Sequence, residues 1–424
     1  MIFFGSTGVH MSRLIKLTAL LVAAMLVLSS CGLEGEREEI TQPEQATQKI
    51  YTVIPSDREL IKAVWLNYEE IGAMSSGGEE GFRKNVDSAF SKIKQAGFNR
   101  VIAHVRAFSD AFYPSGLFPF SKYLSGTQGA DPGFDALKIM TEAAHAHSLK
   151  IDAWINPYRV SYDSNPSHLY NGSPAFKYLQ SDRERGNVIV LEGGIFYNPA
   201  STEVRRLILD GIREIIDGYN VDGIHFDDYF YPSKEPAIDL AQYNAYRAAG
   251  GKLSQDNWRR ENVNALISGV YSLLKQKSPQ LVFSVSPGGD IEKNYYDYYA
   301  DVALWSTRSG YVDVIMPQLY YGFYNGHLPF EKTLEGWISL AKSSEVKLCI
   351  GLAFYKCGTV DEFAGEGRDE WTQYTNILQR QLQIIKLKPD CDGFAAYSYS
   401  HIFSDSLNPI ARQELEYALE EILN

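Results

Sequence analysis

Basic residues are scarce in this chain relative to acidic ones. Lys and Arg number 40 against 52 Asp and Glu, so the net charge is −12 at pH 7. A nucleic-acid binder normally carries a basic patch that pairs with phosphates, so this balance argues against nucleic acid as a partner. With 45% hydrophobic and 22% charged residues, the 424-residue chain is otherwise typical of a globular protein with a large core.

The chain also has few cysteines and no sequence pattern typical of a metal site. The chain has four cysteines, none in C-x-x-C spacing, and no His-x-x-x-His pair or carboxylate cluster that would indicate an obligatory metal. We therefore expect no metal and no cofactor. Cys349, Cys357 and Cys391 are expected to be partly buried free thiols, although one disulfide would be compatible with an exported protein.

The N-terminus lacks a full membrane-spanning segment. Its apolar run covers only 17–28, whereas a span needs about 20 apolar residues. Two basic residues precede this run, and residues 28–32, Leu-Ser-Ser-Cys-Gly, have the form of a bacterial lipobox. We predict a signal peptide over 1–31 and a lipid on Cys31. An uncleaved anchor helix is the alternative. Both place the rest of the chain outside the cytoplasm, at the outer face of the cell membrane or facing the periplasm.

The remainder of the chain divides into a short tether and one folded domain. The polar segment 32–57, rich in Glu, Gln and Thr, is predicted to be flexible, and the domain is predicted over 58–424. The predicted strands are 62–67, 101–106, 150–156, the run that ends at Asp227, 281–286, 312–318, 347–352 and 393–398. The predicted helices are 82–96, 134–147, 202–217, 257–277, 334–342, 371–386 and 408–423.

Eight strands that alternate with helices are the pattern of an α/β fold, the (β/α)8 TIM barrel. The segments after the third strand (157–199) and after the fourth (to about 255) are too long for plain connections, so we predict loop excursions there. A doubly wound open sheet is the competing fold. It is disfavoured because no G-x-G-x-x-G follows the first strand.

The stretch 220–232 carries the clearest chemical signal. It reads as an apolar strand that ends in two adjacent carboxylates, Asp227 and Asp228. Because a strand alternates its faces, His225, Asp227 and Tyr229 should share one face. Burying an unpaired charge is costly, so carboxylates at the end of an apolar strand are rarely there for stability. We predict acid/base chemistry on a polar substrate.

Polar and aromatic residues also mark the ends of other predicted strands. In a TIM barrel the active site lies at the carboxyl ends of the strands. Substrate binding is therefore assigned to nine residues at or near these ends: Arg106, Trp154, Asn156, Arg159, His225, Ser286, Gln318, Tyr320 and Tyr355. The 28 tyrosines of the chain fit either a packed core or a cleft that faces sugars.

Several of these residues have structural alternatives. Arg106 could pair with Asp227 or Asp228 as a buried ion pair, and Tyr320 could be a packing residue. The histidines at 104 and 225 lie inside predicted strands, where a hydrogen-bonded core residue is the ordinary explanation.

Seven groups of residues resemble, in order, the motifs of one family. They are 105–106 with 110–115, 153–159, 221–232, 258–263, 284–287, 316–320 and 351–356. These motifs lie within a stretch from Trp65 to about Phe403, nearly the whole domain. It resembles the bacterial glycoside-hydrolase-like family ten, which comprises exported lipoproteins with a TIM-barrel domain.

The resemblance implies hydrolysis of a bacterial envelope polysaccharide. A related division-site enzyme acts on peptidoglycan glycan strands stripped of their peptides, so peptidoglycan or a related N-acetylated glycan is the implied substrate. The expected partners are this polysaccharide and, through the lipid anchor, the membrane. Two other functions stay open: a non-catalytic glycan-binding barrel, and a hydrolase of another polysaccharide such as a capsular or dietary glucan.

Most glycosidases use two carboxyl groups. Asp227 is the first catalytic candidate and Asp228 the second. Since adjacent carboxylates repel, one is expected to hold a proton near neutral pH and act as the acid. In a weaker similarity to chitinase-like barrels, Asp227 matches the inner Asp, but Tyr229 stands where the acid Glu would be. Glu192 is an alternative proton donor from outside the strand.

Overall fold

A computed structural model describes residues 59–341 and 345–424. The predicted signal peptide, the lipid site Cys31 and the tether lie outside the described residues.

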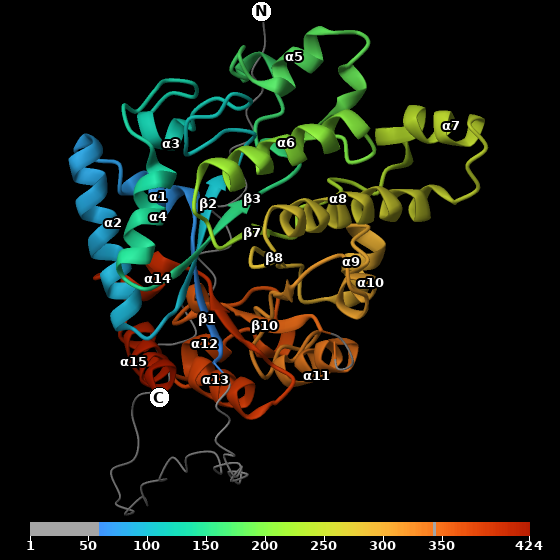
Figure 1. The fold of residues 1–424 in the computed structure, drawn as a ribbon. Coiled ribbons are helices and arrows are strands. Elements are labelled where there is room, and N and C mark those ends of the chain that lie inside the picture. Colours follow the sequence, from blue (N-terminus) through green and yellow to red (C-terminus); the bar gives the residue numbers. More distant parts are fainter. Residues whose placement is uncertain (1–58, 342–344) are drawn as a thin grey trace, which may run out of the picture. The chain divides into compact units, whose positions relative to one another are not determined.

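Eight parallel strands close into a barrel (Figure 1), as the sequence predicted. Around the barrel each strand pairs with its neighbour in the chain, and the first pairs with the last, with Ala63 opposite Ala395. The strands are β1 (Ile61–Leu66), β2 (Arg100–Arg106), β3 (Lys150–Ile155), β7 (Gly223–Phe226), β8 (Val282–Val285), β9 (Val314–Ile315), β10 (Lys347–Leu352) and β11 (Gly393–Ala396).

One predicted strand is much shorter than expected. The run 312–318 forms a ladder only over β9, at Val314 and Ile315. Pro317 has no N–H to give to a ladder, which ends regular pairing there. Gln318 makes only isolated bridges, with Gly288 and Gly351.

Helices surround the barrel (Figure 1). They are α1 (Tyr68–Ala73), α2 (Gly78–Gln95), α3 (Lys122–Ser125), α4 (Ala136–Ala146), α5 (Pro174–Gln180), α6 (Thr202–Gly218), α7 (Leu240–Ala248), α8 (Gln255–Lys277), α9 (Ile291–Asp297), α10 (Val302–Thr307), α11 (Phe330–Ala341), α12 (Glu370–Gln373), α13 (Ile377–Leu387), α14 (Tyr399–Phe403) and α15 (Pro409–Leu423). In α6 the Ser201 side chain accepts from the Val204 N–H and caps the helix, whose buried face carries Ile208 and Ile212.

The single helix predicted over 371–386 is wrong, because the chain breaks between α12 and α13. Tyr374 adopts an extended conformation (φ −116°, ψ 153°), and its ring packs 6.0 Å from that of Tyr324. Just before the break, the Glu370 carboxylate accepts the backbone N–H groups of Phe323 and Tyr324, which ties α12 to the loop after β9.

Two long segments extend from the barrel. After β3, a second sheet forms in the order β4–β6–β5 from antiparallel strands β4 (Arg159–Ser161), β5 (Val188–Leu191) and β6 (Gly194–Tyr197). After β7, the chain forms α7, which Figure 1 shows at the outer edge beside one end of α8 and which buries none of its residues.

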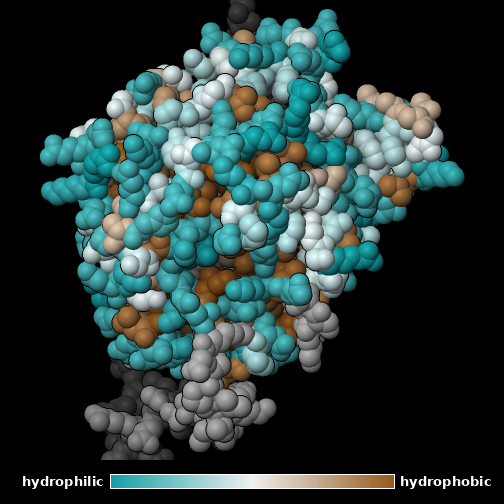
Figure 2. Space-filling model, in the orientation of Figure 1, coloured by the Kyte–Doolittle hydropathy of each residue, from teal (hydrophilic) through white to brown (hydrophobic). Residues whose placement is uncertain are grey.

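Apolar side chains fill two layers. The barrel interior holds a small cluster that includes Trp65, Ile102 and Trp154, and a larger core lies mainly between the strands and the helices. Cys349 and Cys357 are buried free thiols, as expected, and Cys391 is also buried. The face drawn in Figure 2 is mostly hydrophilic, with separate hydrophobic patches. Among residues 59–341 and 345–424, no helix combines the length and apolar character needed to cross a membrane.

Candidate active site at the barrel mouth

The carboxyl ends of the barrel strands and the loops that follow them form what we call the mouth. Asp227 stands there, directly after β7. Ile224 and Phe226 of this strand pack outward into the helix layer, whereas His225 points into the barrel. Asp227 is 2% exposed, and its Oδ2 atom has no hydrogen-bond partner. The Tyr229 ring, 49% exposed, lies at the rim.

The environment of Asp227 favours its protonated form. Burial raises its pKa to about 8; the cation of Arg159 opposes this rise and the neighbouring carboxylate of Asp228 adds to it. The Asp227 side chain therefore holds a proton at neutral pH, the state in which a carboxyl group can donate it.

Asp228 also faces the mouth, because β7 ends at Phe226 and the chain turns there. The Asp228 side chain is partly buried, and burial raises its pKa. A hydrogen bond from Gln318, at the end of β9, and the charge of Arg159 act in the opposite direction. The two carboxyl groups thus share one mouth in different surroundings.

Arg159, the first residue of β4, is held among aromatic rings. Its guanidinium carbon lies 4.1, 5.0 and 5.5 Å from the ring centres of Tyr229, Tyr162 and Phe108. The guanidinium also donates a hydrogen bond to the Tyr162 hydroxyl. Stacking on ring faces favours a cation at a site that is only 4% exposed. The second sheet therefore brings a fixed positive charge to the catalytic candidates.

His225 lies beneath the mouth and is fully hydrogen-bonded. Its Nδ1 lies 2.8 Å from Ser284 Oγ, and its Nε2 lies 3.0 Å from Ser286 Oγ and 3.2 Å from Trp65 Nε1. Gln318 donates from Nε2 to the Ser286 carbonyl at 2.9 Å. Burial lowers the pKa of His225 to about 3, so the ring is neutral. These contacts make His225 a support of the site and correct its assignment to substrate binding.

Aromatic residues line another part of the mouth. The rings of Tyr320 and Tyr355 lie 5.7 Å apart, and each lies 6.0 Å from the ring of Tyr397. Lys356 donates to the Tyr320 carbonyl at 2.7 Å and holds this wall in place. Burial raises the pKa values of Tyr355 and Tyr397 to about 12, which keeps their hydroxyl groups protonated.

Trp154 lies in β3, and Asn156 comes directly after the strand. Trp154 Nε1 donates to Asn156 Oδ1 at 3.0 Å, and the indole stacks on the His104 ring at 3.6 Å. The structure therefore brings together at or just beneath the mouth all the predicted catalytic and substrate-binding residues except one.

The exception is Arg106, which does not face the mouth. The pairing of β2 with β3 shifts register between His104 and Arg106, and this bulge turns the arginine outward. The Arg106 guanidinium packs on the ring of Phe118 at 4.5 Å, and Gly211 of α6 leaves room for it. The expectations that Arg106 binds substrate or pairs with Asp227 or Asp228 are wrong.

Glu192, the alternative proton donor, is exposed in the turn between β5 and β6. In the described part of the chain, no group of three or more His, Cys, Asp or Glu side chains is arranged to hold a metal ion.

The model of the family described as Glycosyl hydrolase-like 10 matches residues 60–366. The chain belongs to this family. Glycosyl hydrolase YngK from Bacillus subtilis (strain 168) is 32% identical over 357 residues, which cover 78% of this chain and 67% of that protein. Glycosyl hydrolase DigH from Escherichia coli (strain K12) is 29% identical over 441 residues, which cover 95% of this chain and 96% of that protein.

Among solved structures, alpha-L-fucosidase isoenzyme 2 from Paenibacillus thiaminolyticus aligns with a TM-score of 0.54 at 14% identity. The alignment covers 86% of this chain and 49% of that one, so this chain spans about half of the fucosidase. This likeness shows the fold alone: both chains form a TIM barrel.

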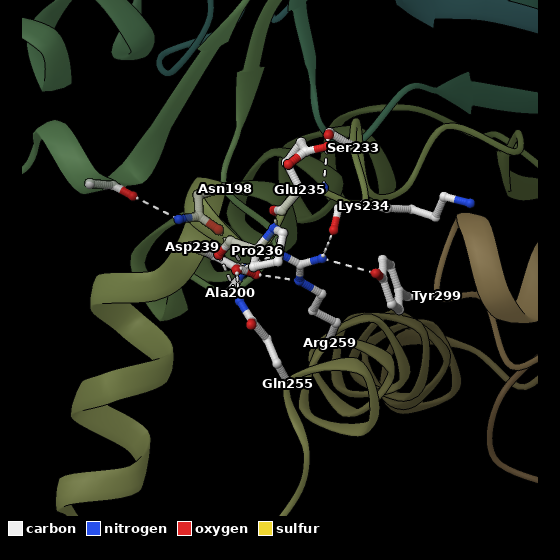
Figure 3. Close-up of polar contacts among 11 residues, drawn as sticks. Asn198, Ala200, Ser233, Lys234, Glu235, Pro236, Asp239, Gln255, Arg259 and Tyr299 are labelled. Carbon is white, nitrogen blue, oxygen red and sulfur yellow. Dashed lines mark hydrogen bonds and ion pairs between the residues drawn. The ribbon is translucent and has the colours of Figure 1, made fainter.

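The family-matched region also contains a buried clamp behind the mouth (Figure 3). Arg259 of α8 binds both carboxylate oxygens of Asp239, at 2.9 and 2.7 Å. The same guanidinium donates to the carbonyls of Lys234 and Glu235 and to the hydroxyl of Tyr299. Arg259 thereby holds the far part of the segment that begins at Asp227 and Asp228. This contact gives motif 258–263 a structural role.

Two mouth residues were not recognised in the sequence, Trp65 and Tyr397. Tyr397 comes directly after β11, just as other polar residues follow other strands, so its position was an available signal. It lies beyond the family-matched region. Trp65 lies inside β1, where a tryptophan looks like any core residue until its contact with His225 is known.

Proposed function

We propose that this protein is a lipid-anchored glycoside hydrolase that cleaves glycan strands of the bacterial envelope, in particular peptidoglycan strands. Family membership and the TIM barrel support glycosidic bond hydrolysis. The observation that carries the proposal is the pair of carboxyl groups in one mouth, with Asp227 buried beside Arg159 and Asp228 more open and bonded to Gln318.

The roles of the two carboxyl groups follow from their surroundings. The protonated Asp227 donates its proton to the glycosidic oxygen as the bond to the anomeric carbon breaks. Asp228, the more exposed group, takes the carboxylate role and stabilises the positive charge that develops on the sugar. Water then supplies a hydroxyl to the anomeric carbon, and its remaining proton restores Asp227.

Zymography on purified sacculi tests this function. Wild-type protein should clear the sacculi, and Asp227→Asn should lose at least 100-fold in rate, because the amide has no acidic proton to donate. Mass spectrometry of the released fragments identifies the bond that is cut. Absence of clearing by wild type, together with retained binding to sacculi, would instead indicate a glycan-binding barrel. Cleavage of a glucan panel without clearing of sacculi would indicate another polysaccharide.

The lipid anchor is a separate part of the proposal and rests on the lipobox at residues 28–32. Wild-type protein should take up labelled palmitate and sediment with membranes, and Cys31→Ala should lose the label. An uncleaved anchor helix would keep the protein on membranes without label in both forms.

A further inference from the structure

Two histidines point into the barrel from strands on either side of β3, and their surroundings differ. His225 of β7 has protein partners for both ring nitrogens. His104 of β2 has none for either nitrogen, although it is only 1% exposed. Buried polar atoms in proteins are nearly always paired, so a buried imidazole without a well-formed hydrogen bond needs an explanation.

The chemical state of His104 is defined by its neighbours. Burial lowers its pKa well below the ordinary value, the charge of Arg159 acts in the same direction, and a loose hydrogen-bonding contact with the Asn156 side chain acts against them. The ring is therefore neutral and offers one N–H donor and one acceptor nitrogen. Its plane is fixed by stacking on Trp154, at 3.6 Å and 10°.

Other polar atoms without partners lie around this ring. They are Asn156 Nδ2, Arg159 Nε and Asp227 Oδ2. Trp154 holds the oxygen of Asn156, which leaves the amide nitrogen of Asn156 as the free end. Donors and acceptors without a well-formed hydrogen bond thus gather beside the proposed proton donor, where Asp227 Oδ2 has only the longer contact with Arg159 Nη2 at 3.6 Å.

We propose that these four groups form the hydrogen-bonding site for one sugar ring at the bond to be cleaved, and that His104 determines which sugar it accepts. This inference rests on the proposed glycan function. A sugar hydroxyl both donates and accepts a hydrogen bond, which matches the donor nitrogen and the acceptor nitrogen of a neutral imidazole. The Tyr68 ring lies edge-on to His104, with ring centres 5.5 Å apart, so a sugar that binds the imidazole must displace it.

A pair of phenylalanine substitutions tests the inference. His104→Phe keeps a flat ring that stacks on Trp154 but removes both nitrogens. His225→Phe is the matched control, on the strand at the other side of β3. Peptide-free tetrasaccharide fragments of peptidoglycan strands serve as the probe. Affinity is measured by calorimetry in the Asp227→Asn background, which prevents turnover, and thermal unfolding is measured for the same proteins.

His104→Phe should weaken fragment binding by about 10- to 100-fold, the usual effect of one or two lost hydrogen bonds. Its melting temperature should be unchanged or higher, since no bond within the protein is lost. His225→Phe should instead lower the melting temperature, because Ser284 and Ser286 lose their partner. His104→Gln, which restores one donor and one acceptor, should bind better than His104→Phe.

Equal fragment affinity of Asp227→Asn with and without His104→Phe would overturn this inference and leave the proposed function intact. A lower melting temperature for His104→Phe with unchanged affinity would assign the histidine to packing. If wild-type protein neither binds the fragments nor clears sacculi, the proposed function fails, and this inference fails with it.

Discussion

The Nη2 atom of Arg159 lies 3.6 Å from Oδ2 of Asp227. At this distance the positive charge acts on the carboxyl group without a short hydrogen bond. Burial and Asp228 raise the pKa of Asp227, Arg159 lowers it, and the balance leaves a proton on Asp227 near neutral pH. The mouth therefore depends on three neighbouring ionisable groups, and each can be changed separately.

The pH profile of hydrolysis should report on this balance. If Asp227 is the acid, kcat/KM should fall as pH rises past about 8, the pKa of its side chain. Arg159→Met removes a charge that lowers this pKa, so the alkaline limb should move up by about one pH unit. Asp228→Asn removes a charge that raises it, and the limb of its residual activity should move down.

The control for the arginine is Arg213→Met, which breaks an exposed pair with Asp210 on α6. It should leave the alkaline limb in place. Movement of the limb in the same direction for Arg159→Met and Asp228→Asn would contradict the assignment of Asp227 as the acid.

Stability should also depend on Asp227. Its pKa is about 8 in the folded protein and near the ordinary 3.8 when unfolded. Both states hold the proton below pH 4; as pH rises from 4 to 8 only the unfolded state releases it, so the free energy of unfolding falls. Asn cannot release a proton, so the advantage of Asp227→Asn over wild type should grow by about 3 kcal/mol between pH 5 and 8. Urea unfolding at both pH values measures it, and a constant difference would argue against the raised pKa.

The clamp behind the mouth should be important for stability. Arg259→Lys keeps the charge but loses the fork that binds both Asp239 oxygens and two backbone carbonyls. The free energy of unfolding should fall by about 3 kcal/mol, the usual cost of breaking a buried ion pair. Arg368→Ala breaks only exposed pairs and should change it by less than about 0.5 kcal/mol. Similar changes in the free energy of unfolding for both substitutions would show that the clamp stabilises the fold no more than an exposed ion pair does.

Exposed aromatic residues beyond the mouth should bind distant sugars of a long strand. Tyr324 and Phe363 are 55% and 88% exposed, on the loops after β9 and β10, which are joined by a bond from Gly326 N–H to the Ala364 carbonyl. Aromatic faces offer a flat apolar surface to sugar rings. Phe363→Ala should weaken binding of long strands by about threefold to tenfold, the equivalent of one aromatic contact, and leave disaccharide binding unchanged.

The matched control for that measurement is Leu423→Ala. Leu423 is also well exposed, at 60%, but it follows Ile422, whose carbonyl binds Lys62 near the start of β1, at the other end of the barrel. Equal affinity of Phe363→Ala and wild type for long strands would remove these loops from the glycan path.

The barrel could be predicted from sequence because its signal is periodic: apolar runs of strand length alternate with amphipathic helices. The mouth could be predicted because parallel strands bring their carboxyl ends together, which placed Asp227, Asn156 and Gln318 in one site. The position of Arg106 could not be predicted, because a single-residue shift in the pairing of β2 with β3 turns its side chain away from the mouth. Nor could the sequence separate His104 from His225, because the partners of His225 come from β8, 59 and 61 residues away.

The direction of β1 has a consequence for where the protein can work. All eight strands run toward the mouth, so the first strand begins at the opposite end of the barrel, at Ile61. In the proposed anchored form, the chain from the anchor therefore joins the barrel at the end opposite the catalytic groups. A fully extended segment over 32–57 would add at most about 90 Å. The enzyme could then reach strands up to about this distance from the bilayer.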